Sequence, residues 1–304
     1  MNPETFKPAS NKMTERQAEE KLDEILSNPE YSFLVTIPKN VEIINEAATA
    51  IEALHFVNSK IEERERRTFV LKKIEDVEGV EQGEISFQGF KKVFNRILNN
   101  KQSIGEGGDA FVYIAESELT NGTTALCYKF AKQIGKNLGR NSLEQELDLH
   151  VDFYKALKNF DSSVKVPEPY YYCEFTSHKM IAMERLKARS VDDLLRGFGS
   201  MPAWVTEETV NTFCADIKKS LDYCHAKGLY HRDLHLGNLM FTQSPTPTPI
   251  LGYIIDFGVS AVGQEGLEPY KSSDSRGTFT YADDYGRIEE VRSSLLRLIA
   301  REIS

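Results

Sequence analysis

The segment YHRDLHLGNLMF, residues 230–241, places charged and polar side chains inside a run that is otherwise suited to burial. Asp233 and Asn238 lie on it, with His235 between them. An acid and an amide on one loop can accept a proton and bind a metal ion through oxygen. A second acid, Asp256, ends the apolar run GYII and precedes Phe–Gly. A carboxylate at the end of an apolar strand is a poor structural choice unless it binds something.

Two upstream segments supply complementary chemistry. GEGGDAFV, residues 105–112, is rich in glycine, and glycines let backbone N–H groups approach phosphates because no Cβ intervenes. An ordinary tight hairpin would show the same pattern. Lys129 lies within the apolar strand CYKFA, where a buried ammonium needs an anionic partner. Glu144 or Glu146 of the following helix can provide one, and the alternative is that Lys129 extends to solvent.

Phosphate binding, charge neutralisation and proton acceptance are the requirements of phosphoryl transfer. Residues from about 100 to 260 resemble the eukaryotic-type protein kinase superfamily. The resemblance rests on GEGGDAFV, LCYK, a glutamate in the next helix, MIAMERL, YHRDLHLGN and DFG. It implies an α+β fold with a β-rich N-lobe at about 100–186 and a shortened helical C-lobe at about 187–304. A mostly helical accessory region, 1–99, precedes this domain.

The resemblance also implies the catalytic roles. Asp233 would be the catalytic base, and His235 would lie beside the transferred phosphate. Lys129 would hold the α- and β-phosphates of ATP and pair with Glu146. Glu146 is preferred to Glu144 because apolar residues then follow on its inward side of the helix.

The same resemblance implies ATP and Mg²⁺ as cofactors. Asn238 and Asp256 would bind the metal ion. Met183 would be the gatekeeper, and Glu184 and Leu186 would supply hinge backbone hydrogen bonds. The full set implied to bind the nucleotide is Ile104, Gly105, Gly107, Gly108, Val112, Cys127, Lys129, Met183, Glu184, Leu186 and Met240.

The segment after DFG departs from the family pattern. Residues 259–304 contain no A-P-E motif and lead from GTFTY directly into one helix, so the peptide-docking helices are expected to be missing. The compact kinases among bacterial effectors, with their IGxGGxAxVY loop, are similar. Asp284 or Asp283, at the start of that last helix, would brace the catalytic loop.

Two residues bear on the acceptor. His235 stands where serine/threonine kinases usually carry lysine, and HxDLHxGN resembles aminoglycoside and choline kinases. Arg232 favours protein kinases, since it can pair with a phosphorylated activation segment, although it could instead bond to loop backbone. Candidate phosphorylation sites are Ser272, Ser273, Ser275, Thr278 and Thr280. A serine/threonine protein kinase is therefore predicted, with a small-molecule kinase and a partner-dependent or pseudokinase-like binding module as alternatives.

Composition limits the partners and the compartment. A net charge of −9 and a pI near 5.4 argue against nucleic-acid binding. Four scattered cysteines without a CxxC pair indicate a reducing compartment, and no apolar run suggests a signal peptide or a membrane span. We therefore expect a cytoplasmic protein, in the host cytoplasm if it is a secreted effector. Its expected partners are ATP, an unidentified protein substrate and an activating protein.

Helical patterns dominate the first hundred residues. TERQ at 14–17 is a capping box that predicts a helix through about Leu26. Apolar spacing predicts a second helix over about 41–67. The segment 86–98 predicts a third, with one stripe made of Phe87, Phe90, Phe94, Ile97 and Leu98. A fourth helix, capped by Ser142, is expected to carry Glu146.

Overall fold

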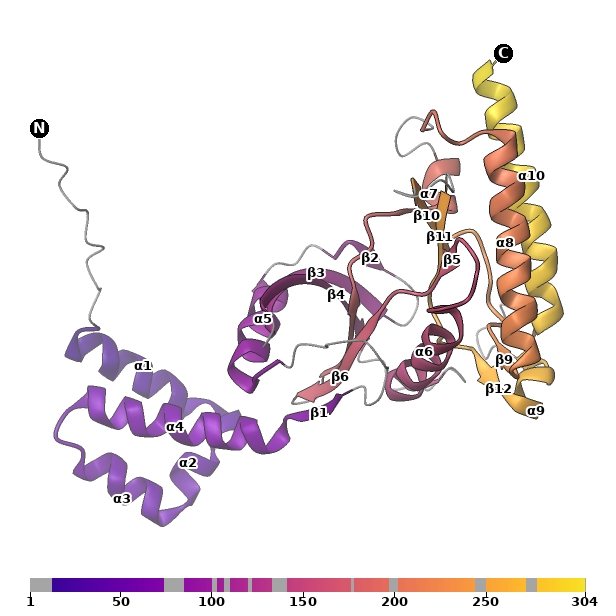
Figure 1. Ribbon diagram of the computed structural model, residues 1–304. Helices are drawn as coiled ribbons and strands as arrows, with labels where there is room; N and C mark the ends of the chain where they lie inside the picture. The colour runs from indigo at the N-terminus through magenta and orange to yellow at the C-terminus, as the bar shows by residue number, and fades with distance from the viewer. Residues whose placement is uncertain are drawn as a thin grey trace, which may run out of the picture. The chain divides into compact units, whose positions relative to one another are not determined.

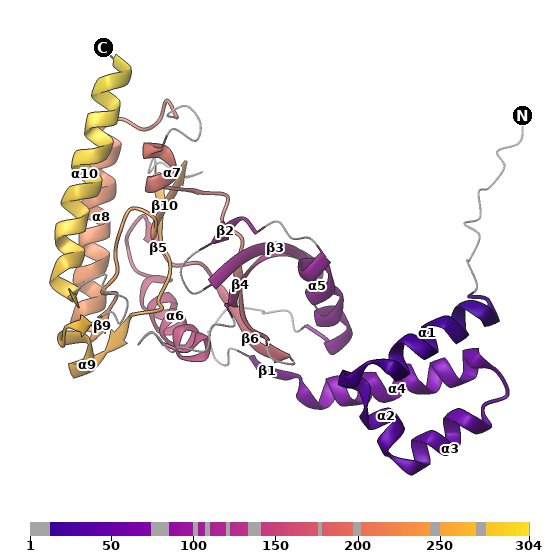
Figure 2. The ribbon, with the colours of Figure 1, turned by 180° about the vertical axis from the view of Figure 1, so that it is seen from behind.

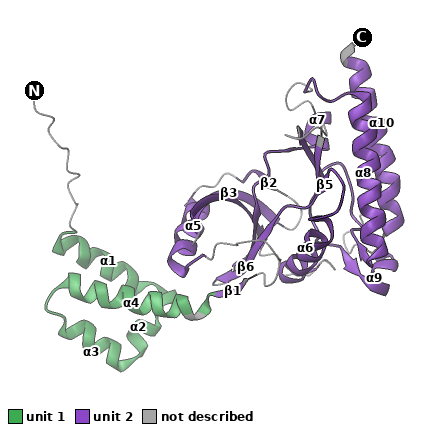
Figure 3. Ribbon diagram, viewed as in Figure 1, with its two compact units in different colours: residues 1–69 green, residues 70–304 purple. Residues whose placement is uncertain are grey.

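The chain divides into two compact units, residues 1–69 and 70–304 (Figure 3). The computed structural model describes residues 13–73, 85–99, 103–106, 110–119, 122–132, 141–175, 178–196, 202–243, 250–271 and 278–303. The division falls earlier than the predicted boundary at 99/100. Helix α5 (Phe87–Asn99) and strand β1 (Val70–Lys73) both pack into the second unit, since β1 pairs with its main sheet and α5 contacts strand β3 (Ala110–Leu119).

The first unit is helical. Its elements are α1 (Glu15–Ser27), a short 3₁₀ turn η1 (Pro29–Tyr31), α2 (Phe33–Thr36), α3 (Pro38–Glu46) and α4 (Ala50–Thr68). The capping box at Thr14 and Gln17 forms as predicted. A single helix over 41–67 is wrong, because the chain leaves helical geometry at Ala47 and Thr49 caps α4 by accepting the Glu52 N–H. A capping threonine starts a new helix in this way because its oxygen replaces a missing backbone acceptor.

A six-stranded antiparallel sheet, in the order β1-β6-β7-β4-β3-β2, forms the first lobe of the second unit (Figures 1 and 2). The strands besides β1 and β3 are β2 (Gly105–Glu106), β4 (Gly122–Ala131), β6 (Pro169–Phe175) and β7 (His178–Glu184). This sheet is the predicted β-rich lobe, and the α+β architecture is confirmed. β1 was missed, because a four-residue edge strand leaves too short a pattern to recognise in sequence.

Alternation along the strands assigns Lys129 to the face on which α6 (Leu143–Leu157) packs. Ile181 is buried against Leu143 and Leu147 of α6, and Lys129 lies directly opposite Ile181 on the neighbouring strand. Cross-strand partners share a face, so Lys129 points toward α6. Phe130, the next residue, faces the other way and stacks on Phe94 of α5.

Helix α5 covers the opposite face with aromatic side chains. Phe90 and Phe94 are buried and meet Phe175 of β6 edge to face, with ring centroids 5.7 and 5.2 Å apart. The predicted aromatic stripe is therefore core. Leu98 is the exception, since it is 49% exposed. Leu98 comes eleven positions after Phe87, almost three full turns at 3.6 residues per turn, so it lies beside the half-buried Phe87 at the edge of the buried stripe and not at its centre.

The second lobe is built on two long antiparallel helices, α8 (Glu207–Ala226) and α10 (Tyr281–Ile303), which lie side by side in Figures 1 and 2. Asn211 contacts Arg292 at one end of the pair, and Asp222 contacts Tyr285 at the other. Two shorter helices, α7 (Val191–Leu195) and α9 (Gly263–Leu267), complete the helical part. The remaining strands are β5 (Val164–Lys165), β8 (Arg189–Ser190), β9 (Leu229–Tyr230), β10 (Leu239–Gln243), β11 (Ile250–Ile254), β12 (Ala261–Val262), β13 (Tyr270–Lys271) and β14 (Thr278–Phe279).

All four cysteines are free thiols, and three of them are buried. Burial raises the pKa of the fourth, Cys127, to about 11, although nearby Lys129 opposes this. In the part of the chain that the structure describes, no helix combines the length and apolar character needed to cross a membrane.

Candidate active site

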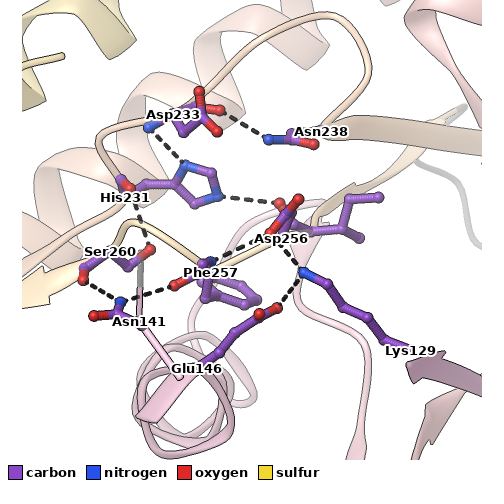
Figure 4. Close-up of polar contacts among 11 residues, drawn as sticks. Lys129, Asn141, Glu146, His231, Asp233, Asn238, Asp256, Phe257 and Ser260 are labelled. Carbon is purple, nitrogen blue, oxygen red and sulfur yellow. Dashed lines mark hydrogen bonds and ion pairs between the residues drawn. The ribbon is translucent and has the colours of Figure 1, made fainter. Parts of the chain in front are cut away.

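The loop from His231 to Asn238 connects β9 to β10 and is fixed by hydrogen bonds along its length (Figure 4). The His231 ring accepts the Asp233 N–H at Nδ1 (3.3 Å) and bonds through Nε2 to the Ile255 carbonyl (3.1 Å). The Asn238 amide nitrogen donates to the Asp233 carbonyl (2.9 Å). These bonds involve only the backbone N–H and carbonyl of Asp233, so they fix the position of the residue without occupying its carboxylate.

Asp284 braces this loop from the first turn of α10. Its two carboxylate oxygens accept the backbone N–H groups of Arg232 (2.9 Å) and Leu234 (2.8 Å). Arg232 has φ of +66°, a left-handed conformation that is costly for a non-glycine residue and that these bonds hold in place. Asp283 instead caps α10 by accepting the Thr280 N–H (2.8 Å). The structure thus distinguishes the two candidates for the brace in favour of Asp284.

Replacing the brace should destabilise the protein. Asp284 is 1% exposed, so Asp284→Ala leaves two buried N–H groups without an acceptor. We expect a loss of about 2–6 kcal/mol in the free energy of unfolding, since each of the two unsatisfied buried donors costs about 1–3 kcal/mol. Urea denaturation checks this, with Asp283→Ala as the control that loses only a helix cap worth about 1 kcal/mol. Equal losses for the two variants would contradict the brace.

Arg232 is bonded to loop backbone. Its guanidinium donates to the carbonyls of Val259 (2.8 Å) and Glu265 (3.1 Å), and more weakly to those of Ser260 and Glu268. The sequence left two roles open for Arg232, pairing with a phosphorylated activation segment or bonding to loop backbone. The structure shows the bonds to loop backbone. Ser272, Ser273 and Ser275 lie outside the described residues.

Lys129 lies between two carboxylates (Figure 4). Its Nζ donates to Glu146 Oε1 at 2.6 Å and to Asp256 Oδ1 at 2.8 Å. Burial alone lowers the pKa of Lys129, but the charges of Asp256 and Glu146 outweigh that effect and raise its pKa above the usual value. Lys129 is therefore a fixed cation and does not extend to solvent. Glu144 lies elsewhere, on the exposed side, near Lys72.

An apolar cleft opens between the two lobes beside this ion pair. It is lined by Ile104, Val112, Ile114, Cys127, Lys129, Glu146, His150, Pro167, Met183, Glu184, Arg185, Leu186, Asn238, Met240, Ile255, Asp256 and Phe257. The apolar residues predicted to enclose a nucleotide base, the hinge residues and the two predicted metal ligands thus converge on one cavity. Gly105 lies in β2, next to the lining residue Ile104, while Gly107 and Gly108 lie outside the described residues.

The donor set at the inner end of the cleft suits a hard cation. Asp256 contributes a carboxylate, and the Asn238 amide nitrogen is bonded to the Asp233 carbonyl, which leaves the amide oxygen as its other polar atom. Carboxylate and amide oxygens are the ligands that Mg²⁺ prefers. Asp256 is held at φ +66°, a left-handed conformation of the kind that concentrates at functional sites. The residues present therefore fit the implied metal.

His235 is exposed and lines a second, more polar cavity that also contains Asp233, Asp192, Arg196 and Arg287. Its Nδ1 accepts the Gly237 N–H at 3.0 Å, so the ring is folded back on its own loop. A Cβ on residue 237 would lie 2.9 Å from the His235 ring, so a larger residue there would displace this exposed ring from its present position. His235 and Asp233 therefore line the same outer cavity.

Two residues near the site were not anticipated in these roles. His150, on α6, donates from Nε2 to the Pro167 carbonyl (2.7 Å) and stacks on Phe257 with ring centroids 4.9 Å apart. Asn141, just before α6, bonds to the segment after Asp256. Neither position carries a local sequence signal, because each contact joins segments more than fifteen residues apart.

Two buried histidines should make stability depend on pH. Burial lowers the pKa of both His150 and His231 to about 4, and their hydrogen bonds to carbonyls do not offset it. The unfolded chain binds these protons near pH 6.5, so the contribution is complete above 6.5 and is lost as pH falls toward 4. We expect each histidine to contribute a loss of about 3 kcal/mol over that window. Urea denaturation between pH 7 and 5 checks this, and His150→Gln should show a shallower dependence than the wild type.

A sheet-rich lobe and a helical lobe that enclose an apolar cleft, with a lysine–carboxylate cluster at its inner end, define a two-lobed, kinase-like protein. The comparison with known families agrees: residues 98–283, more than half of the chain, match the family described as "Protein kinase domain". The chain belongs to that family.

Similar curated proteins carry kinase names. Serine/threonine-protein kinase dst3 of Dictyostelium discoideum is 26% identical over 147 residues, which cover 48% of this chain and 24% of that protein. Maternal embryonic leucine zipper kinase of Danio rerio is 28% identical over 55% of this chain and 22% of that protein. Serine/threonine-protein kinase PknH of Mycobacterium bovis is 23% identical over 53% and 24%. The matched part thus spans about a quarter of the length of these relatives.

Proposed function

We propose that this chain transfers the γ-phosphoryl group of ATP, with Mg²⁺, to a serine or threonine hydroxyl of a protein. The observation that supports this most is the position of Lys129 between Glu146 and Asp256, at 2.6 and 2.8 Å, at the end of an apolar cleft. A buried lysine ammonium held by two acids beside an apolar cavity is suited to a ligand with an apolar ring and an anionic tail.

The nucleotide would enter with its base between the lobes. Val112, Cys127 and Met240 would contact the base, with Met183 behind it, and Ile104 would cover its outer side. The backbone N–H of Glu184 donates to the Glu168 carbonyl at 2.7 Å, so a hinge N–H donor would have to come from Leu186. The phosphates would lie against Lys129 and the glycine-rich turn that begins at Gly105.

Chemistry would take place at the catalytic loop. Asp233 would accept the proton of the acceptor hydroxyl as oxygen–phosphorus bonding begins, a general-base role. Lys129 would hold the α- and β-phosphates and offset their charge. Asn238 and Asp256 would hold Mg²⁺, which when bound neutralises the phosphate charge that grows during transfer. His235 offers Nε2 to the acceptor or the transferred phosphate, because its Nδ1 is occupied by Gly237.

Transfer of ³²P from labelled ATP tests the proposal. The purified protein is incubated with Mg²⁺ and [γ-³²P]ATP, alone, with generic protein substrates, with cell lysate, and with aminoglycosides and choline-like amines. We expect label on protein serine or threonine. Label on a small amine or sugar would replace the acceptor by a small molecule, and label only in the presence of lysate would indicate an activating partner. Absence of transfer in every mixture, with Mg·ADP binding intact, would favour the non-enzymatic binding module.

We propose that residues 70–304 form the kinase domain and that the helical unit before it is an accessory region. The family match begins at residue 98, but α5 and β1 are built into the sheet of the same unit. A fragment that starts at residue 70 should therefore bind Mg·ADP, whereas one that starts at residue 100 should lack the aromatic cover of α5. Calorimetry on the two fragments tests this boundary.

A further inference from the structure

We propose that Asn141 is a positioning residue that ties the start of α6 to the segment after Asp256 and so keeps Glu146 and Asp256 on either side of Lys129. Its side-chain nitrogen donates to the carbonyls of Ser260 (2.9 Å) and Phe257 (3.4 Å), and its backbone N–H donates to the Gly258 carbonyl (2.9 Å) (Figure 4). Both side-chain acceptors are carbonyl oxygens, so the amide must present its NH₂ group to them.

Asn141 lies immediately before α6, the helix that carries Glu146, so its bonds affect where that helix sits. Ser142, the next residue, is the N-cap of α6, and Glu146 follows within the first turns of that helix. Phe257 follows Asp256 directly. The bonds of Asn141 therefore connect the element that carries one lysine partner to the segment that carries the other. Together with the two ion pairs of Lys129 they close a ring of contacts around the inner end of the cleft.

The same bonds extend to the catalytic loop through Ser260. The Ser260 hydroxyl donates to the His231 carbonyl at 3.1 Å, and the Ser260 carbonyl also accepts from Arg232. Asn141 thus joins α6 to the loop that carries Asp233 by way of one shared residue. Displacing α6 would break the bonds of Asn141 to the same segment that holds the His231 carbonyl through Ser260.

Neighbouring polar side chains at the start of α6 are committed elsewhere. Ser142 and Gln145 form a capping box with each other's backbone N–H groups. Glu144 is directed toward Lys72. Among residues 141–146, Asn141 is thus the one whose side chain donates to the segment after Asp256, and the role requires a hydrogen-bond donor. Aspartate has the same shape but would place a carboxylate against two carbonyls.

The kinetic part of this inference rests on the proposed function. If the link is lost, only a fraction of molecules would keep both Glu146 and Asp256 in register with Lys129, and apparent nucleotide affinity would fall in proportion to that remaining fraction. Two neutral hydrogen bonds support a change of about tenfold. We expect Asn141→Ala and Asn141→Asp to raise the dissociation constant of Mg·ADP and to lower kcat/KM for ATP by about that factor. Asn211→Ala, which removes a half-buried asparagine that contacts Arg292 on the α8–α10 surface, should change either quantity less than about twofold.

A double-mutant cycle separates positioning from a merely structural role. In a Glu146→Gln background the lysine has already lost its charged partner on α6, so adding Asn141→Ala should change Mg·ADP affinity less than about twofold. Effects that multiply across the two sites would overturn the proposal. Hydrogen–deuterium exchange gives a readout that needs no activity: Asn141→Ala should speed exchange of the amides of 143–147 and 257–261 together and leave α8 unchanged. If the wild type neither binds Mg·ADP nor transfers phosphate, the proposed function fails, and unchanged exchange in Asn141→Ala would separately overturn the link.

Discussion

Asp233→Asn should reduce phosphoryl transfer by about 10²–10⁴-fold, the usual contribution of a general base. The substitution preserves shape, and the bonds that fix the loop go to the backbone N–H and carbonyl of Asp233, which the change leaves in place. The affinity for Mg·ADP and the melting temperature should therefore stay close to those of the wild type. Single-turnover transfer from [γ-³²P]ATP, with calorimetry and thermal denaturation on the same samples, measures all three quantities.

The matched control for this prediction is Asp192→Asn. Asp192 lines the same outer cavity as Asp233 but forms an exposed ion pair with Arg196. Removing an exposed pair changes stability by less than about 1 kcal/mol, and we expect transfer to stay within about twofold. Transfer at the wild-type rate by a folded Asp233→Asn protein would remove Asp233 from the role of base. An equal loss of transfer in Asp192→Asn would show that the negative charge of the whole cavity, and not the Asp233 carboxylate in particular, supports transfer.

Lys129→Ala should lower transfer by about 10²–10³-fold, the usual effect of removing one fixed electrostatic donor. In contrast with Asp233→Asn, it should also weaken Mg·ADP binding. It should further destabilise the fold, because it leaves the buried carboxylate of Glu146 without its cation. Breaking a buried pair from one side costs about 3–5 kcal/mol.

The double variant Lys129→Met with Glu146→Gln separates stability from activity. Both charges of the buried pair are then absent, so unfolding free energy should recover much of the loss seen in Lys129→Ala. Transfer should not recover, because the phosphates still lack their ammonium partner. Urea denaturation and single-turnover transfer on the three proteins give the comparison. Recovery of transfer in the double variant would contradict the role of Lys129.

The expected segments of the second unit were recognisable because each leaves a local pattern. Ser142 with Gln145 predicts the start of α6 by capping chemistry, and both bonds form. The apolar strand around Lys129 follows from the local sequence pattern. The pairing of Lys129 with Glu146 was predictable in part, since inward apolar residues set the helical register. The break between α3 and α4 was missed, because Thr49 competes with a helical pattern that continues through it.

The local sequence patterns were enough to predict the kinase-like class, the residues that line the cleft and the loop that carries Asp233 and Asn238. Tertiary structure alone decided that Asp284 and not Asp283 braces this loop, that Arg232 bonds to backbone carbonyls, and that Asn141 reaches the segment after Asp256. The physical reason is the range of each interaction. Capping and periodicity depend on residues three or four apart, whereas these contacts join segments separated by 27 to 119 residues and exist only once those distant segments have packed together.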